Sequence, residues 1–460
     1  MMVNNFEKYK QLIFDFPEFV YHDFHYLFTD NELQIRYHFE VPGLEVFYPE
    51  ITIPITEDIK KNYATDSIIR NLVFHIGMVE LISYWKCVCS PKLIILPVSL
   101  TENQILWWKN LYFQGLGEFF YLNNIPAEMS DFMTIQSQGD ILAKSSLKTD
   151  ADKILVPVGG GKDSVVSLEL LKSHFNIQPF ILNPRPASLQ CVEASGIGMD
   201  RCLLAYRKID PALIGLNERG FLNGHTPFSA LLAFVTLLVS SLHGIRYVAL
   251  SNESSANEST TRTSGVNHQY SKSFEFESDF RDYYKEFVCS DIEYFSFLRP
   301  LSELQIASLF ARYDQYFQIF KSCNAGSKED KWCGKCPKCL FAYIILSPFM
   351  PIDKLKKAFG TNMFEKEFMM KEMDELTGKN PVKPFECVGT VEEVNEALHR
   401  YILRYSDSSE VLLKHYIDSE EYNLAGKQLS DITQVSDLAG THFLEPRFIN
   451  LIKNALHGDS

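Results

Sequence analysis

The sequence predicts an α/β protein built around a doubly wound parallel sheet, with an α+β region before the sheet and a helical region after it. Between about residues 150 and 320, short apolar runs of strand type alternate with stretches of helical periodicity. A glycine-rich turn joins the first of these runs to the helical stretch that follows it. Such alternation is typical of parallel sheets with right-handed crossovers.

The length and composition allow two or three domains with sizeable cores, since 46% of the 460 residues are hydrophobic. We expect a substrate-binding α+β domain over residues 1–148, an α/β nucleotide domain over 149–348 and a helical region over 349–460. The net charge of −14 argues against a nucleic-acid partner, because phosphate backbones are bound by clustered lysine and arginine. The N-terminus lacks the basic segment and apolar core of a signal peptide, so we expect a cytoplasmic protein.

Two strands followed by two helices are expected in the N-terminal region. The predicted segments are 33–41, 50–54, 71–85 and 104–121. The first alternates apolar and polar side chains and ends at Pro42-Gly43, the pattern of a half-buried strand followed by a turn. The last is dense in aromatic residues, and such stripes usually pack in a core. The alternative to core packing is that Trp107 and Trp108 bind substrate.

Strands and helices then alternate along the central region. The predicted strands are 154–158, 179–182, 202–205, 247–251 and 294–298. The predicted helices are 164–174, 188–195, 226–242, 278–289 and 301–313. The most apolar of these helices contains four serine or threonine residues and is too short and too polar for a confident membrane span, so we expect no membrane partner. Beyond residue 350, segments 392–403 and 409–417 fit amphipathic helices.

Ligands of open α/β sheets bind beyond the carboxyl ends of the strands. Loops 159–164 and 251–258 leave the predicted strands at that edge, and so does the loop that begins at Asn183. Asn183, Asn252 and Glu253 are therefore candidate ligands of a nucleotide or of its metal. His225 precedes the apolar helix, where it either caps the helix or takes part in an active site.

The motif with the most specific chemistry is Val156-Pro157-Val158-Gly159-Gly160-Gly161-Lys162-Asp163-Ser164. It reads as a buried strand, a three-glycine turn and the start of a helix. Glycines let the backbone approach a ligand closely, and a helix N-terminus presents unpaired N–H groups, so the pair forms an anion cradle. The lysine adds a positive charge, and the aspartate offers oxygen ligands for Mg²⁺.

Two common phosphate-binding motifs do not fit this loop. A Walker A loop has four residues between its glycines and then Gly-Lys-Ser/Thr, whereas Lys162 is followed by Asp163. A dinucleotide fingerprint requires a third glycine where this chain has Ser164.

Four of the ten cysteines form a second cluster with metal-ligand spacing. Cys323, Cys333, Cys336 and Cys339 follow the pattern C-x9-C-x2-C-x2-C. Four thiolates can complete a tetrahedral zinc site with no open position, which indicates a structural role. A run of three cysteines at this spacing also occurs in iron–sulfur ligation, so a cluster is the alternative.

The glycine loop resembles the PP-loop of ATP pyrophosphatases, Ser-Gly-Gly-x-Asp-Ser, with Gly159 in place of the first serine. A PP-loop with a late four-cysteine site is also similar to 7-cyano-7-deazaguanine synthases, which are much shorter. Over most of its length the chain more closely resembles the UDP-N-acetylmuramoyl-L-alanyl-L-glutamate epimerases of bacterial cell-wall synthesis. The matching stretches are 106–112, 158–164, 267–273, 299–304, 332–341 and 383–389.

The resemblance implies a PP-loop (HUP-like) fold and an isomerase that uses ATP and Mg²⁺. The implied substrate is UDP-MurNAc-L-Ala-L-Glu, whose terminal glutamate is adenylated and inverted to D-Glu with release of AMP and diphosphate. On this reading the phosphates are bound by Gly159, Gly160, Gly161, Lys162 and Ser164. Asp163, with Glu253, would hold Mg²⁺, and Asn183 and Asn252 would contact the nucleotide.

Proton transfer and substrate binding receive less specific candidates. Those for proton transfer are His225, His268, Tyr270 and Lys272. Lys162, which would neutralise charge on the departing diphosphate, and Asp163, which would hold Mg²⁺, are the other catalytic candidates. Those for substrate binding are Trp107, Trp108, Arg299 and Lys383. Two other hypotheses are another adenylating enzyme of the superfamily, whether nitrile-forming, amidating or tRNA-thiolating, and a nucleotide sensor without turnover.

Overall fold

The computed structural model describes residues 5–63, 67–261, 265–326, 329–405, 409–425, 430–435 and 441–458. The chain forms two compact units. Unit 1 consists of Met1–Leu155, Leu203–Val248 and Tyr270–Tyr294, and unit 2 consists of Val156–Cys202, Ala249–Gln269 and Phe295–Ser460. Each unit therefore draws on separate parts of the chain. The domain boundaries expected near residues 148 and 348 stay predictions.

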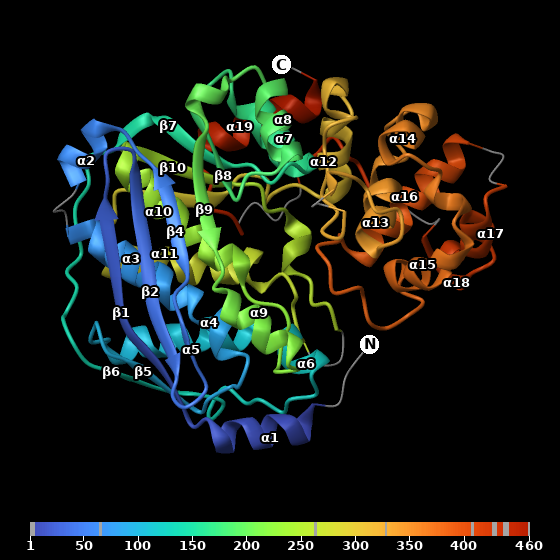
Figure 1. Ribbon diagram of the computed structural model, residues 1–460. Coiled ribbons are helices and arrows are strands. Elements are labelled where there is room, and N and C mark those ends of the chain that lie inside the picture. Colours follow the sequence, from blue (N-terminus) through green and yellow to red (C-terminus); the bar gives the residue numbers. More distant parts are fainter. Residues whose placement is uncertain are drawn as a thin grey trace. The chain divides into compact units, whose positions relative to one another are not determined.

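Unit 1 is built on a sheet with the strand order β6-β5-β1-β2-β4-β9, and β3 pairs with β2. These strands are β1 (Glu18–Phe28), β2 (Glu32–Val41), β3 (Glu45–Phe47), β4 (Glu50–Pro54), β5 (Lys92–Ile95), β6 (Thr134–Ser137) and β9 (Leu203–Lys208). β1, β2 and β4 run side by side in Figure 1 and pair antiparallel, with Ile35 opposite Ile51. Alternate residues of β2 are buried, which confirms the strand predicted from its pattern.

The strand expected near residues 202–205 exists as β9, but its pairing in unit 1 differs from the prediction. It runs antiparallel to β4, with Ile51 opposite Arg207. The prediction placed it among parallel strands, whereas β4 and β9 together extend the antiparallel strands of the N-terminal region. β5 and β6 pair parallel to β1 and to each other.

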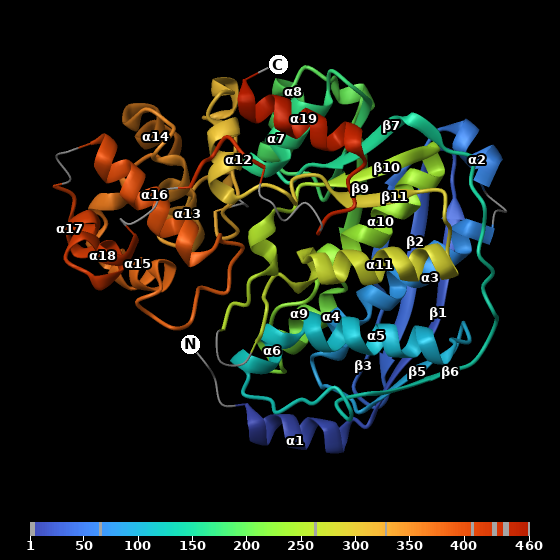
Figure 2. The same ribbon diagram turned by 180° about the vertical axis from the view of Figure 1, so that it is seen from behind.

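Long helices cover this sheet. The main ones are α3 (Ser67–Glu80), α5 (Glu102–Gly115), α10 (Phe228–His243) and α11 (Phe274–Phe287). α3 packs on α10, and α5 lies beside α11 in Figure 2. The apolar helix predicted from residue 226 is confirmed as α10, which ends at Gly244 in the left-handed conformation. The smaller elements are α1 (Phe6–Asp15), α2 (Glu57–Tyr63), α4 (Ile82–Trp85), α6 (Gly117–Leu122), α9 (Pro211–Glu218) and η3 (Tyr270–Lys272).

Three strands begin in unit 1 and end in unit 2. They are β7 (Asp150–Pro157), β10 (Ile245–Leu250) and β11 (Glu293–Ser296). With β8 (Asn176–Leu182) they follow the order β11-β10-β7-β8. β7 and β10 are parallel neighbours, so the loops after their carboxyl ends leave the same edge of the sheet. This arrangement confirms the mixed α/β class and puts the glycine loop where the sequence predicts it.

Helices make up most of the remainder of unit 2. They are α7 (Lys162–Leu171), α8 (Pro186–Ala194), α12 (Glu303–Phe310), α13 (Pro337–Leu346), α14 (Ile352–Phe359), α15 (Met370–Thr377), α16 (Val391–Arg404), α17 (Val411–Ile417), α18 (Glu420–Ala425) and α19 (Pro446–His457). α12 and α19 both pack on α7. Figures 1 and 2 show α13 to α18 gathered together, which confirms a helical C-terminal region. Among the described residues, no helix combines the length and apolar character that crossing a bilayer requires.

We expect His75 to make the stability of the protein depend on pH. Its ring is buried in unit 1, with Nε2 3.0 Å from the hydroxyl of Tyr283. Burial lowers the pKa of His75 from 6.5 to about 4, so the unfolded chain takes up a proton that the folded chain does not. The stabilisation is fully present above pH 6.5 and is lost as the pH falls toward 4, and it amounts to about 3 kcal/mol.

The melting temperature of His75→Gln should therefore fall less than that of the wild type between about pH 7 and pH 4.5. Glutamine keeps a polar group near Tyr283 but does not titrate. His25→Gln is the control, because the side chain of His25 is 82% exposed. Equal losses of melting temperature in the His75 variant and the wild type would contradict this account.

Candidate functional site

The glycine loop lies between β7 and α7 in unit 2, and its shape depends on glycine at one position above all. Gly160 has a φ of +86°, and a Cβ atom there would lie 2.9 Å from the backbone nitrogen of Ser188. Gly161 is the N-cap residue of α7, and a Cβ there would lie 3.3 Å from that of Ser322. A side chain at Gly159 would meet open space. The loop is thus closely packed at its second glycine and open at its first.

α7 begins at this loop and presents its N-terminal N–H groups there, which together with the helix dipole favours an anion. Ser164, predicted to bind phosphate, donates its hydroxyl to the carbonyl of Gly161 at 3.0 Å, so it bonds within its own turn in this structure. The backbone of the loop is also held from outside, because the amide of Lys321 donates to the carbonyl of Gly160 at 2.7 Å.

Lys162, the first residue of α7, is buried and paired with two carboxylates. Its ammonium group contacts Asp163 and also Glu303, which begins α12. The Lys162 and Glu303 side chains are 8% and 5% exposed, whereas that of Asp163 is 34% exposed. Burial alone would lower the pKa of Lys162, but the charges of Asp163 and Glu303 outweigh it and raise the pKa. The lysine is therefore positively charged.

Further acidic side chains surround this pair. Burial raises the pKa of Glu303 well above its usual range; Lys162 opposes this, and Asp163, Glu253 and Glu393 add to it. Burial is thus the main cause of the Glu303 pKa shift, whereas carboxylate partners cause that of Lys162. The direct contact between Glu303 and the ammonium group favours the ionised pair. We call Lys162, Asp163, Glu253, Glu303 and Glu393 the acidic cluster. Such a group of carboxylates repels an added anion unless cations accompany that anion.

Two capping boxes position the cluster. Ser302 caps α12, and its hydroxyl accepts from the amide of Gln305 at 3.2 Å. Thr390 caps α16, and Glu393 accepts from the amide of Thr390 at 2.8 Å. The other oxygen of Glu393 accepts from the amide of Glu303 at 2.7 Å. The starts of the two helices are thereby joined at the lysine.

The loop after β10 contributes two of the predicted ligands. Glu253 is buried and accepts from the hydroxyl of Ser255 at 3.2 Å. The side-chain amide of Asn252 donates to the hydroxyl of Ser296 at 3.0 Å. Asn183, at the end of β8, is exposed and has a φ of +55°.

Arg299 and Lys383, predicted to bind substrate, hold protein groups in this structure. Arg299 is buried and donates to the carbonyl of Glu253 at 2.7 Å. Lys383 pairs with Glu258, and its amide donates to the carbonyl of Thr260 at 3.2 Å. Both residues therefore brace the loop that carries Glu253.

His268 belongs to unit 2 and is half-buried. Its amide donates to the hydroxyl of Thr260 at 3.0 Å, and its ring centroid lies 6.5 Å from that of Phe385. The neighbouring Glu386 accepts from Asn324 at 3.2 Å. Burial raises the pKa of Glu386, while the charges of Lys338 and His268 lower it.

The other predicted proton-transfer residues, His225, Tyr270 and Lys272, belong to unit 1. Nδ1 of His225 lies 3.5 Å from a carboxylate oxygen of Glu118. Tyr270 is buried, and its hydroxyl accepts from Asn110 at 3.2 Å. Burial, with the charges of Asp279 and Glu275, raises the pKa of Tyr270, which keeps the phenol neutral. Lys272 ends the short helix η3 and is half-buried.

The tryptophan pair of α5 packs in unit 1. Trp108 is fully buried and donates to the hydroxyl of Tyr283 at 2.9 Å. Trp107 is half-buried, stacks on Tyr283 with centroids 4.1 Å apart, and donates to the carbonyl of Asp279. These contacts account for both rings as packing, so substrate binding by the pair stays a prediction.

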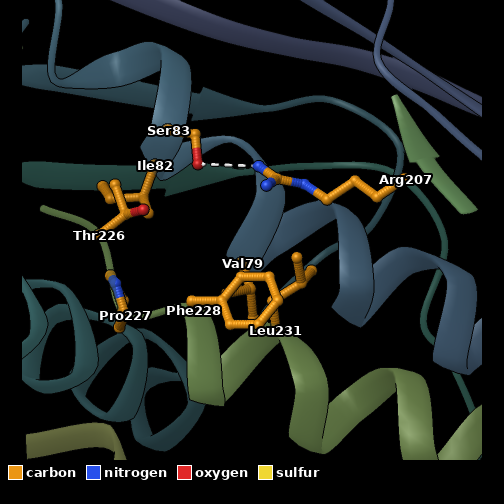
Figure 3. Close-up of a pocket in the computed structure, with 8 residues that line it drawn as sticks. All are labelled: Val79, Ile82, Ser83, Arg207, Thr226, Pro227, Phe228 and Leu231. Atoms are coloured by element: carbon orange, nitrogen blue, oxygen red, sulfur yellow. Dashed lines mark hydrogen bonds between the residues drawn. The ribbon is translucent and has the colours of Figure 1, made fainter. Parts of the chain in front are cut away.

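Figure 3 shows a small cavity in unit 1 at the start of α10. Its volume is about 10 Å³, and it is lined by Val79, Ile82, Ser83, Arg207, Thr226, Pro227, Phe228 and Leu231. Arg207 forms a bidentate pair with the buried Glu80, at 2.7 and 2.9 Å, and donates to Ser83 at 3.3 Å. A cavity of this size holds about one water molecule, so it is not a substrate site by itself.

The four cysteines of the second motif converge in unit 2. All their sulfur atoms lie within 4.8 Å of one another, and Cys336 is 3.4 Å from Cys339. The hydrogen bond with Cys339 lowers the pKa of the Cys336 thiol to about 5. Four converging sulfurs suit a tetrahedral metal such as zinc. Because Lys321 and Ser322 precede Cys323 and contact the glycine loop, this site also braces that loop.

Unit 2 thus brings together the glycine loop, Lys162, Asp163 and Glu253, as the sequence predicts for one edge of a sheet. Glu303 and Glu393 were not among the residues predicted from the sequence. A signal for their helix starts existed, because Ser302-x-x-Gln305 and Thr390-x-x-Glu393 are capping boxes. That signal gives local structure only and does not show that both helices begin beside Lys162.

Comparisons with known proteins show which family the chain is similar to. The chain matches the family model of the MurL N-terminal domain over residues 12–297 and that of the MurL C-terminal domain over residues 319–429. It is similar to the UDP-N-acetyl-alpha-D-muramoyl-L-alanyl-L-glutamate epimerase of Salinispora tropica, with 36% identity over 77% of this chain and 78% of the relative. The protein of that name from Xanthomonas oryzae pv. oryzae is 33% identical over 79% of this chain and 82% of the relative. No solved structure shows a significant match.

We expect Cys336→Ser to lose a bound metal and to melt at a lower temperature than the wild type. A structural metal site contributes folding energy, and removing one of four ligands weakens it. Metal analysis of the purified wild type should find zinc, and absorption in the visible range would indicate an iron–sulfur cluster instead. Cys202→Ser is the matched control, because Cys202 is half-buried and lies outside the four-cysteine group. Unchanged metal content and melting temperature in Cys336→Ser would contradict the assignment.

Proposed function

The chain belongs to the MurL family of UDP-N-acetyl-alpha-D-muramoyl-L-alanyl-L-glutamate epimerases, and we propose that it inverts the terminal glutamate of UDP-MurNAc-L-Ala-L-Glu in an ATP-dependent reaction. In this proposal ATP adenylates the glutamate carboxylate, and AMP and diphosphate are released. The product serves peptidoglycan precursor synthesis. A nucleotide-linked substrate of this kind fits the cytoplasmic location expected from the sequence.

The observation that carries the proposal is the buried, charged Lys162 at the start of α7, directly after the glycine loop. A helix N-terminus, a loop whose first glycine faces open space and a fixed ammonium group are the parts that a triphosphate needs. Three glycines followed by Lys-Asp-Ser also support the placement in the PP-loop superfamily. We assign Gly159, Gly160, Gly161, Lys162 and Ser164 to the phosphates, and Asn183 and Asn252 to the remainder of the nucleotide.

Adenylation solves a problem of acidity. The α-proton beside a free carboxylate is very weakly acidic, because the carbanion would gather a second negative charge on the same group. An acyl-adenylate removes one charge, and preorganised donors can then stabilise the enolate. Return of a proton on the opposite face inverts the centre, and water releases AMP. Lys162 supports the first step by offsetting charge on the departing diphosphate.

Magnesium and zinc both fit the donor atoms present. Carboxylate oxygens are the ligands that Mg²⁺ prefers, and Asp163 and Glu253 supply them within a cluster of excess negative charge. A bound Mg²⁺ would reduce repulsion between the acidic cluster and the triphosphate. The four cysteines fit structural zinc, which would hold Lys321 and Ser322 against the glycine loop.

Proton transfer requires two groups, one for each face of the α-carbon. His268, Tyr270, Lys272 and His225 remain the candidates, and we propose that the pair comes from this set. Arg299 and Lys383 remain candidates for the anionic groups of the substrate, and Trp107 and Trp108 for its uncharged part.

The test is incubation of the protein with ATP, Mg²⁺ and UDP-MurNAc-L-Ala-L-Glu in D₂O. Diphosphate should be released, and deuterium should appear at the α-carbon of the glutamate, because the proton there is lost and regained from solvent. Recovered glutamate should have the D configuration. Diphosphate release without deuterium would show adenylation without inversion, and no release at all would reject the proposal.

We expect Asp163→Asn to abolish turnover and leave the fold intact. Asparagine has nearly the same shape but lacks the charge that holds Mg²⁺ beside the phosphates. Diphosphate release should fall to background while the protein stays folded, because Glu303 still pairs with Lys162. Asp353→Asn is the control, because Asp353 also lies in the first turn of a helix, α14, and is exposed. Full activity of Asp163→Asn would contradict the metal assignment.

A further inference from the structure

The proposed reaction leaves two buried carboxylates of unit 2 unused. Glu303 begins α12 and Glu393 lies in the first turn of α16, so they are 141 and 231 residues beyond Lys162 in the sequence. Both are buried, and buried carboxylates are rare unless they are paired. Glu393 accepts a hydrogen bond from the amide of Glu303, and the carboxylate of Glu303 contacts the ammonium group of Lys162.

Lys162 needs a partner that fixes its position. A lysine side chain is flexible, and its ammonium is a compact point charge that can occupy many positions. Asp163 follows it directly in the chain and therefore moves with it. Glu303 belongs to a different helix, so its contact with the ammonium ties the lysine to a separate part of unit 2.

Glu303 is itself held firmly. Its amide donates to Glu393 at 2.7 Å, and Ser302 caps its helix. Glu393 is held in turn by the amide of Thr390 at 2.8 Å. α12 also packs on α7, the helix that Lys162 begins. The carboxylate that faces the lysine is thus fixed at its backbone by two helix starts.

We propose that Glu303 is the positioning residue for Lys162 and that Glu393 keeps Glu303 in place, so that the C-terminal helical region sets the geometry of the phosphate loop. This inference rests on the proposed function, in which Lys162 offsets charge on the departing diphosphate. Without nucleotide, Glu303 pairs with the ammonium. With nucleotide bound, the ammonium would contact the phosphates as well as Glu303. The contact with Glu303 would hold the ammonium beside the diphosphate on which negative charge develops.

If Glu303 positions Lys162, its substitution should lower kcat without raising the KM for ATP. Glu303→Gln keeps the shape of the side chain and removes its charge. The acidic cluster then repels ATP less, so the KM for ATP should stay unchanged or fall. The ammonium is no longer held, and misplacement of a catalytic group by about 1 Å costs about 100-fold in rate, so we expect a loss of about that size in kcat. Glu303→Asp keeps the charge and should recover part of the loss, and Glu393→Gln should show a smaller loss.

The matched control is Glu169→Gln. Glu169 also lies on α7, its side chain is 6% exposed, and it is paired with Lys172 at 2.7 Å and with the hydroxyl of Tyr316. It takes no part in the acidic cluster, so its variant should keep the wild-type kcat and KM. Steady-state diphosphate release should be measured for each variant against ATP concentration, with melting temperatures beside it.

A second measurement tests the pair without turnover. Lys162→Met and Glu303→Gln should each change the melting temperature, and the double variant should depart from the sum of the two changes, because paired residues are not additive. Additive changes would overturn the inference, and so would a wild-type kcat in Glu303→Gln or an equal loss in Glu169→Gln. A wild-type protein that releases no diphosphate would instead reject the proposed function, and this inference with it.

Discussion

Lys162 carries a charge that the fold must compensate, because an unpaired ammonium group inside a protein is very costly. The structure meets this requirement with one carboxylate from the same helix and one from α12. Other features of unit 2 depend on this interaction. It fixes where α12 starts relative to the glycine loop, and it gives the capping residues of α12 and α16 a role beyond helix stability.

The excess of acid around this lysine bears on the proposed chemistry. A positively charged pocket would bind a triphosphate tightly in the ground state, and uniform binding of that kind does not accelerate a reaction. In the proposed reaction, Lys162 among several carboxylates would instead accept the triphosphate together with Mg²⁺. Lys162 would then offset charge as it builds on the diphosphate, and Mg²⁺ held by the carboxylates would add positive charge beside it. The acidic cluster would thus couple binding of the nucleotide to binding of the metal.

The glycine loop is supported from two sides that are distant in sequence. The backbone of Ser188 in α8 packs closely against Gly160. The amide of Lys321, which lies just before the four-cysteine site, donates a hydrogen bond to the carbonyl of the same glycine. The four cysteines therefore do more than close a local turn. A metal there would fix the segment that borders the glycine loop, and a structural site would in this way support the proposed reaction.

Local patterns of the sequence were sufficient for the features that depend on neighbouring residues. The alternation of residues 33–41, the apolar helix before Gly244, the glycine turn and the cysteine spacing each predicted an element or a cluster that the structure contains. These signals are reliable because backbone geometry and side-chain periodicity act over a few residues. The antiparallel pairing of β9 with β4 could not be predicted in this way, because strand pairing depends on chain segments about 150 residues apart.

The sequence by itself determined the chemical types at the candidate site: a glycine loop at a helix start, a lysine, carboxylates and four thiols. Only the tertiary structure decided which carboxylates meet the lysine. In the sequence, Glu303 and Glu393 are ordinary acidic residues in the first turns of two helices. In the structure both are buried, Glu303 contacts Lys162, and Glu393 accepts a hydrogen bond from the amide of Glu303. The physical reason is that helix capping is a local interaction, whereas charge compensation in the interior is set by whichever elements the packing brings together.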